Sequence, residues 1–416
     1  MIDKITLPNG VRIVFEHIPY VRSASLGIWV GAGSRHERAA ESGAAHFIEH
    51  MVFKGTKTRT AAEIASLMDG IGGQTNAFTT KECTCFHGRV LDTHLGQLTD
   101  ILCDMFFNSK FDEADVISER GVILEEIDMY RDTPEDLAAE RLFGEIFRGG
   151  SLARPVLGKK STLKKMTGEF LSGYMREKYG AGSIVVALSG SFTPDDISRL
   201  SERFSEAPAR AENTCKPAVY TPSRTVKRKR LEQNHICLAF PGISVTDERR
   251  HTMQLLSDIL GGGMSSRLFQ KVREERGLCY SVYSYGSSYA DTGIFSIYTA
   301  LGRESQEEAL RVIGDELRRF RSGGVTAEEL SRTREQVKAN VLMALESTSA
   351  RMNRLGRNEL YFGAAPDADE IIAHYDAVTA EGIHTLAQTC LDLEMASFCA
   401  VGKIDADADY LDILRG

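Results

Sequence analysis

The stretch FDEADVISERGVILEE, residues 111–126, has a counterpart in VTAEELSRTREQVKAN, residues 325–340, at a shift of 214 residues. Both stretches are predicted to begin long helices, the first of them over residues 112–133. Few residues are identical between the two. Whether they mark an internal repeat therefore depends on the order of the elements around them.

That order recurs. The first half contains the strand ASLGIWVGAG, a helix over HFIEHMVF and a pair of strands over GGQTNAFTTKECTCFHGRV. The second half has HICLAFPG, RHTMQLLSDILGGG and GLCYSVYSYGSSYADTGIFSIYTAL in the same order. β-Branched and aromatic residues favour strands in these segments, and Asn9-Gly10 predicts a hairpin turn near the start.

The fold class follows from this repeat. Residues 208–224 contain three prolines and little periodicity, which predicts a linker. We therefore expect an α+β protein of two similar domains, residues 1–207 and 225–416. Each domain should be a mostly antiparallel sheet covered by helices.

Charge and composition limit the partners. The chain has 50 Lys and Arg against 58 Asp and Glu, a net charge of −8, so we expect neither nucleic acid nor an anionic membrane as partner. No apolar run is long enough for a signal peptide or a membrane span. The eight cysteines are scattered, without a Cys-x-x-Cys pair, which favours reduced thiols and a cytoplasmic or similar reducing location.

The segment HFIEHMVFKGT, residues 46–56, places His46, Glu49 and His50 on one face of a predicted helix. We expect this helix to begin after Ser42 as its N-cap and to end at Gly55. Two imidazoles at positions i and i+4 can hold one zinc ion, and the glutamate between them can take a proton from a water that zinc has made acidic. A helix with polar side chains and no metal is the alternative.

A catalytic zinc needs a third protein ligand, and the long helix offers three carboxylates. Glu119 and Glu126 are seven residues apart, so they share a face, whereas Glu125 lies about 100° from Glu126. The spacing leaves two assignments open: Glu126 is the ligand with Glu119 beside it, or the reverse. Ordinary solvated carboxylates are the third reading of these residues.

Together with LPNGVRIV, GGQTNAFT and GGGMSSRLFQKVREERGLCYSVYS, the segments HFIEHMVFKGT and ERGVILEEI resemble the pitrilysin and insulysin family of zinc peptidases, the inverzincins. Within that family the chain is most similar to the catalytic subunit of the mitochondrial processing peptidase and its short bacterial relatives. The resemblance implies one zinc ion per chain held by His46, His50 and Glu126. It also implies Glu49 as general base and Glu119 as a carboxylate that supports the site without binding metal.

The resemblance further implies substrate contacts. Asn76 and Ala77 match the edge strand along which the family lays its substrate. Arg273 and Tyr280 in REERGLCY match residues that larger members direct at the peptide, as donors to its carbonyl or developing oxyanion. Gly261–Gly263 are similar to a substrate-engaging glycine-rich loop, or they simply end a helix.

The second domain is expected to contact substrate without a metal site. At the position of the motif helix it has Gln254, Ser257 and Asp258, and opposite Glu126 it has Asn340. None of these four residues reproduces the ligands of the first half.

The sequence thus predicts a zinc metalloendopeptidase that hydrolyses peptides or unfolded polypeptide segments. Long members of the family hold two halves in one chain, and this chain has the length of one half. The resemblance therefore implies a homodimer in which Arg273 and Tyr280 of one chain serve the zinc of the other. Two alternatives are a non-catalytic scaffold subunit and a catalytic subunit that needs a dissimilar, inactive partner.

Overall fold

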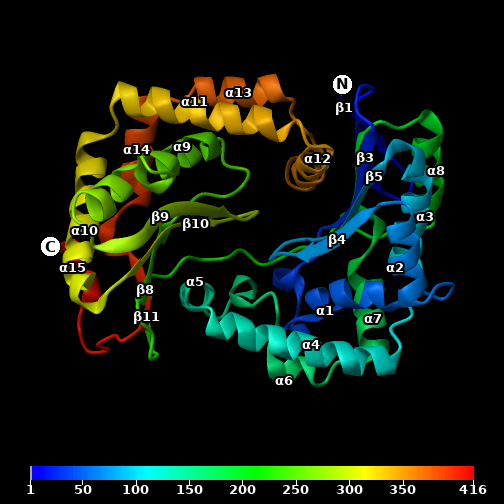
Figure 1. The fold of residues 1–416 in the computed structure, drawn as a ribbon, viewed down its shortest axis with the longest axis horizontal. Coiled ribbons are helices and arrows are strands. Elements are labelled where there is room, and N and C mark those ends of the chain that lie inside the picture. The colour runs from blue at the N-terminus through cyan, green and yellow to red at the C-terminus, as the bar shows by residue number, and fades with distance from the viewer. Residues whose placement is uncertain (1) are drawn as a thin grey trace. The chain divides into compact units, whose positions relative to one another are not determined.

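The computed structural model describes residues 2–416, which form two compact units (Figure 1). The first unit comprises the chain up to Ile127 together with Arg154–Lys216 and Leu342–Asp367. The second comprises Asp128–Ala153, Pro217–Val341 and Ala368–Gly416. Each unit is built around one sheet.

The first sheet has six strands in the order β1-β2-β6-β3-β5-β4, and only the β2–β6 pair is parallel. The predicted hairpin joins β1 to β2, with Gly10 at φ +102°. The strands are β1 Ile2–Thr6, β2 Arg12–His17, β3 Ser23–Val30, β4 Gln74–Thr79, β5 Thr84–Leu91 and β6 Ile184–Gly190.

Successive side chains of a strand point to opposite faces of the sheet, and in the first sheet both faces carry apolar side chains. Helices therefore cover both faces. Ile28 and Val186 point into the main core, where they join Phe47 of α1 and Leu98 of α3. The helices of this unit are α1 Ala44–Met51, α2 Ala61–Gly70, α3 Leu95–Asn108, most of α4 Glu113–Asp132, α6 Lys160–Leu163, α7 Gly168–Lys178, α8 Pro194–Ser205 and α12 Thr348–Phe362.

The second sheet has five strands in the order β7-β11-β8-β10-β9, with β7 and β11 parallel. Its strands are β7 Arg224–Arg228, β8 Asn234–Pro241, β9 Cys279–Ser288, β10 Gly293–Leu301 and β11 Ser397–Gly402. Its helices are α5 Pro134–Ile146, α9 Arg250–Gly261, α10 Gln306–Gly323, α11 Ala327–Ala344, α13 Ala368–Asp376, α14 Ala380–Cys390 and α15 Tyr410–Arg415.

The two sheets share one topology. Removing β1 leaves β2-β6-β3-β5-β4, which matches β7-β11-β8-β10-β9 strand for strand, including the single parallel pair. The long helices α4 and α11 begin at Glu113 and Ala327, again 214 residues apart. The predicted fold class, α+β with two similar and mostly antiparallel sheets covered by helices, is confirmed.

The repeat contains an exchange of helices that the sequence did not predict. Helix α12 belongs to the second half by sequence, yet Met352 and Leu355 pack against Trp29 on the second face of the first sheet. Helix α5 belongs to the first half, yet Leu142 packs against Ala239 on the second face of the second sheet. Each exchanged helix buries an apolar sheet face that water would otherwise contact.

Residues 208–223, within the predicted linker, contain no helix or strand. The domain boundaries themselves stay a prediction. No helix between residues 2 and 416 is long and apolar enough to cross a membrane.

Replacing Gly356 tests the packing of α12 against Trp29 of the first sheet. A Cβ atom at Gly356 would lie 2.2 Å from Trp29 Nε1, and Trp29 is only 3% exposed, so Gly356→Ala should destabilise the first unit by about 1–3 kcal/mol. Gly121→Ala is the matched control, because its Cβ meets open space on α4, and it should raise stability by about 0.5–1 kcal/mol. Urea unfolding followed by Trp29 fluorescence measures both, since Trp29 is the only tryptophan. An unchanged midpoint for Gly356→Ala would contradict this packing.

Candidate metal centre

The metal-site helix α1 is held at its beginning by a carboxylate from outside the helix. Glu37, 2% exposed, accepts hydrogen bonds from the amides of Gly43 at 2.9 Å and Ala45 at 3.0 Å. Burial raises the pKa of Glu37 to about 8, although both amide hydrogen bonds act in the opposite direction. The predicted N-cap, Ser42, is wrong: Gly43 is the N-cap at φ +98°, and Glu37 takes over the capping.

The end of this segment agrees with the prediction. Helix α1 ends at Met51, a short 3₁₀ turn covers Val52–Lys54, and Gly55 follows at φ +114°. That backbone conformation favours glycine, which explains why the chain can leave the helix there.

Three side chains converge from α1 and α4. Glu126 Oε2 lies 3.7 Å from Nε2 of His46 and 3.7 Å from Nε2 of His50. The three ligand atoms all lie within 4.8 Å of one another. Ligand atoms bound tetrahedrally to zinc are about 3.4 Å apart, so a small inward movement would admit the ion. Glu126 Oε2 is also buried without a hydrogen-bond partner in the described chain, as expected for an atom that awaits a cation.

The neutral form of His46 and the hydrogen bond of His50 suit metal binding. Burial, together with the nearby charge of His50, lowers the pKa of His46 to about 3, so its imidazole is neutral at physiological pH. His50 Nδ1 lies 2.9 Å from Glu119 Oε1. A proton on Nδ1 makes that bond and leaves the lone pair of Nε2 free toward Glu126. Between the two assignments left open by the sequence, this geometry favours Glu126 as ligand and Glu119 as support.

Lys54 completes this support and was missed by the sequence analysis. Its Nζ lies 2.5 Å from Glu119 Oε2, and Glu119 is 5% exposed. Burial alone would raise the pKa of Glu119, but hydrogen bonds with Lys54 and His50 bring it below its ordinary value. The position of Lys54, four residues after His50, was the available signal.

The predicted general base, Glu49, lies beside the edge strand β4. Thr79, the last residue of β4, donates from Oγ1 to Glu49 Oε2 at 2.6 Å. Burial raises the pKa of Glu49, while the Thr79 hydrogen bond and the charge of His50 oppose the rise. Thr79 was also missed, because pairing a strand end with a helix is decided by tertiary structure.

Asn76 and Ala77 lie on β4, at the edge of the sheet. They pair with His87 and Phe86 of β5 on one side only, and the Ala77 amide donates to Asn76 Oδ1 at 2.9 Å. The strand that carries both residues thus ends at the Glu49 carboxylate and leaves one edge open to another chain.

Arg273 and Tyr280 lie together in the second unit. Arg273 Cζ is 4.6 Å from the ring centroid of Phe269 and 5.6 Å from that of Tyr280, which is 74% exposed. Helix α9 ends at Gly261, and Gln254 donates to Asp258 at 3.1 Å. Among the described residues, the second unit offers no group of three metal-binding side chains.

Comparison with known proteins identifies the family. Residues 12–160 match insulinase, peptidase family M16, and residues 165–337 match the peptidase M16 inactive domain. The chain belongs to the M16 peptidase family. The family predicted from the sequence is confirmed.

Relatives of this M16 chain share its length. It is 43% identical over 390 residues to "Uncharacterized zinc protease YmxG" of Bacillus subtilis, covering 93% of this chain and 95% of the relative. It is 40% identical over 400 residues to an uncharacterized zinc protease of Streptomyces coelicolor, covering 94% and 87%.

Solved structures show the same fold. A peptidase M16 inactive domain from Pseudomonas fluorescens superposes with a TM-score of 0.91 at 20% identity, over 98% of the M16 chain and 99% of that protein. A protease from Helicobacter pylori gives 0.87 at 18% identity, over 97% and 99%.

Glu119→Gln tests the supporting role of this carboxylate in the M16 chain. The substitution keeps the shape but removes the charge that orients His50, so zinc affinity should fall about 10- to 100-fold. Glu125→Gln, an exposed neighbour on α4, should leave zinc affinity unchanged. Competition with a zinc chelator of known affinity measures both. Equal affinities for the two variants would remove Glu119 from the site.

Proposed function

We propose that the chain is a zinc metalloendopeptidase that cleaves peptides or unfolded polypeptide segments. The observation that carries the proposal is the convergence of His46, His50 and Glu126, whose Oε2 lies 3.7 Å from Nε2 of each histidine, with Glu49 on the same helix face as the histidines. The relatives named zinc proteases support the proposal. Two imidazoles and a carboxylate form a ligand set that suits zinc.

The chain's own residues account for the proton transfers. Bound zinc would act as a Lewis acid toward the scissile carbonyl and would make a water acidic enough to lose a proton near neutral pH. Glu49 takes that proton and passes it to the leaving amine. Its partly desolvated carboxylate, held by Thr79, is aimed at the same side of α1 as both histidines.

The open edge of β4 suggests how a substrate binds. A peptide added to β4 beside Asn76 and Ala77 would be read mainly through its backbone and would extend toward Glu49 at the end of that strand. Only a segment free to adopt an extended conformation can add as a strand. Folded proteins should therefore be poor substrates.

A reducing compartment such as the cytoplasm belongs to the same proposal. None of the eight cysteines forms a disulfide within the described residues, and seven of them are buried. Cysteines without disulfides in this number are typical of proteins kept away from oxidising environments.

Glu49→Gln tests the general base. The variant should still bind about one zinc per chain, because Glu49 is not among the three convergent ligands, but peptide cleavage should fall about 10²- to 10⁴-fold. A quenched fluorescent peptide library together with zinc analysis measures both quantities. A wild-type protein that holds zinc and cuts nothing points to a missing partner. One that holds no zinc supports a scaffold subunit instead.

We also propose a homodimer in which Arg273 and Tyr280 of one copy act at the metal centre of the other. Tyr280 is 74% exposed and the Arg273 guanidinium lies beside its ring, so both side chains could donate to a peptide carbonyl. Mixing the two inactive variants Glu49→Gln and Arg273→Ser should restore about a quarter of the wild-type activity, because a mixed dimer holds one intact site. Activity of the mixture and its sedimentation measure this. An unrestored mixture of dimers, or a fully active monomer, would contradict the shared site.

A further inference from the structure

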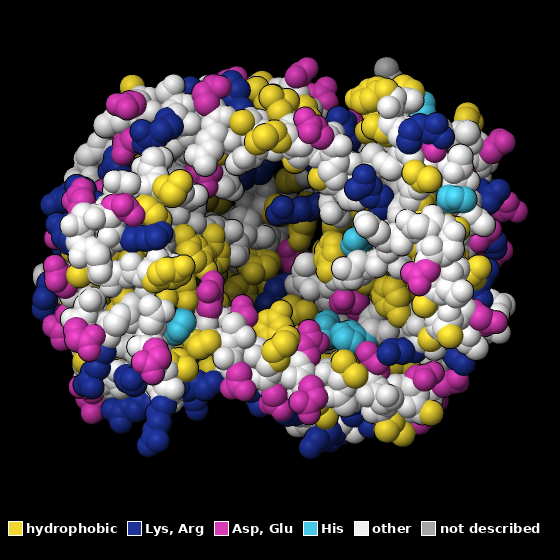
Figure 2. Space-filling model, in the orientation of Figure 1, with side chains coloured by type: hydrophobic (Ala, Val, Ile, Leu, Met, Phe, Trp, Pro, Cys, Tyr) yellow, Lys and Arg dark blue, Asp and Glu magenta, His cyan; other side chains and the backbone are white. Residues whose placement is uncertain are grey.

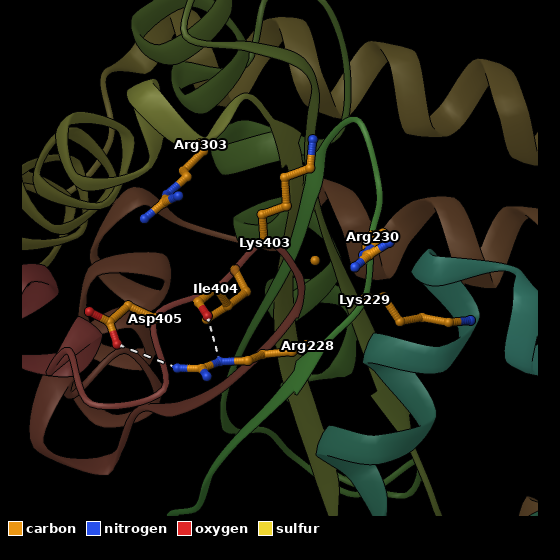
Figure 3. Close-up of a pocket in the computed structure, with 8 residues that line it drawn as sticks. Arg228, Lys229, Arg230, Arg303, Lys403, Ile404 and Asp405 are labelled. Atoms are coloured by element: carbon orange, nitrogen blue, oxygen red, sulfur yellow. Dashed lines mark hydrogen bonds and ion pairs between the residues drawn. The ribbon is translucent and has the colours of Figure 1, made fainter.

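One end of the second sheet carries a basic cavity of about 510 Å³. Five Lys or Arg residues line it, against a single carboxylate, in a chain whose net charge is −8 (Figure 3). Figure 2 shows a group of dark blue side chains projecting at the lower left, around the ends of β8 and β11. The lining groups are Arg228, Lys229, Arg230, Arg303, Lys403 and Asp405.

The strand topology gathers these cations. β7 and β11 are parallel and pair Arg228 with Gly402, so Arg230 and Lys403 follow two strands that end side by side. β10 ends at Leu301, opposite the first residue of β8, and Arg303 follows two residues later. Three segments that are distant in sequence therefore deliver basic side chains to one place.

The turn that carries Lys403 is fixed by a buried amide. Asn234, 1% exposed, accepts from the Lys403 amide at 2.7 Å and donates to Gln306 at 2.7 Å. Gly402 has φ +146°, and a Cβ there would lie 2.3 Å from Asn234 Oδ1. The backbone beneath the cavity is therefore tightly packed and leaves the turn little freedom to rearrange.

Three of the five cations have no protein partner in the described chain. Arg228 is held by the carbonyl of Ile404 at 3.1 Å and faces Asp405 at 3.8 Å, and Lys229 is paired with Asp132 at 3.2 Å. Within residues 2–416, the side chains of Arg230, Arg303 and Lys403 make no hydrogen bond or ion pair, and Figure 3 shows them extending separately around the turn.

The fold does not require these charges. In the first unit, His17 pairs with Gly190 as Arg228 pairs with Gly402, and Gly190 also has a positive φ, +128°. The positions there that correspond to Lys229, Arg230, Lys403 and Arg303 are Ile18, Pro19, Ser191 and Thr93. Two copies of one topology thus differ at this end by a cluster of cations. A ligand is the simplest reason to maintain repelling charges that the shared architecture does without.

We propose that this cavity binds a small anion that carries several phosphate groups. The free cations come from three separate segments and extend separately around the turn, so a chain of phosphates can contact several of them at once. Arginine matches phosphate oxygens through paired donors. Ile404 is the only apolar residue among the lining residues and none is aromatic, so nothing there would stack on a nucleobase. The phosphate chain itself is recognised, in a free oligophosphate or in a nucleoside triphosphate.

Calorimetric titration of the protein at physiological salt tests the ligand class. Tripolyphosphate and ATP should each bind at one site per chain, while AMP and hexaglutamate bind at least about tenfold more weakly. Equal affinities for tripolyphosphate and ATP identify the free phosphate chain as sufficient, and a tighter ATP identifies a nucleotide. No binding at millimolar tripolyphosphate overturns the proposal, and so does hexaglutamate binding as tightly, which would assign the surface to an acidic peptide.

Variants locate the site. Arg303→Ser with Lys403→Ser should weaken tripolyphosphate binding by about tenfold or more, the loss expected from two charge-assisted contacts. Arg319→Ser with Arg332→Ser removes the same charge from exposed positions on α10 and α11 and should change the affinity less than twofold. Equal weakening by both pairs would show general electrostatic attraction and overturn the site. Matching thermal unfolding curves confirm that both double variants fold.

Two further variants sharpen the result. Asp405→Asn frees Arg228 and should tighten binding about threefold, and an unchanged or weaker affinity contradicts the proposal. His46→Ala should bind tripolyphosphate as the wild type does. A loss of binding in His46→Ala would place the anion at the metal centre instead, because phosphate chains also bind divalent metals.

Discussion

Phe47, Ile48 and Met51 on α1 are each at most 1% exposed, and the burial of these three side chains decides where the polar side of the helix points. Residues three and four apart share a helix face, so His46, Glu49 and His50 lie opposite that apolar stripe. Glu37 holds the first turn and Gly55 ends the segment, which leaves α1 one orientation on the sheet. The metal centre depends on this packing more than on any contact among its polar groups.

Four carboxylates near one another keep different characters because their surroundings differ. Glu119 has Lys54 and His50 beside it, which lowers its pKa against the effect of burial, whereas Glu49 and Glu126 have pKa values raised by burial. Burial raises the pKa of Glu37, whose oxygens accept hydrogen bonds from two backbone amides. Environments that separate pKa values in this way assign acid, base and ligand roles to one residue type.

The two units have the same topology, and comparing them shows which features they share and which differ. Both keep the strand order, the glycine with positive φ after the parallel pair, and a helix from the other half of the sequence on the second sheet face. Because of the exchange, each compact unit contains a helix from the other half of the sequence: without α12, Trp29 and its neighbours would face water. Outside this frame the units differ: the first has the candidate metal ligands on α1 and α4, and the second has a cation cluster beside β7 and β11.

Local spacing along the sequence determined the repeat, the fold class and the shared face of His46, Glu49 and His50. It also limited the roles of Glu119 and Glu126 to two arrangements of ligand and supporting carboxylate. These features follow from the periods of helices and strands, which are properties of neighbouring residues. Only the tertiary structure decided that Glu126 faces Nε2 while Glu119 faces Nδ1, because that depends on how α4 crosses α1. The same reason applies to Lys54, to Thr79, to the replacement of Ser42 by Glu37 as cap, and to the gathering of Arg230, Arg303 and Lys403. Each of these features brings together segments that are separate in sequence. Packing decides which segments come into contact, and the residue spacing within one segment does not predict it.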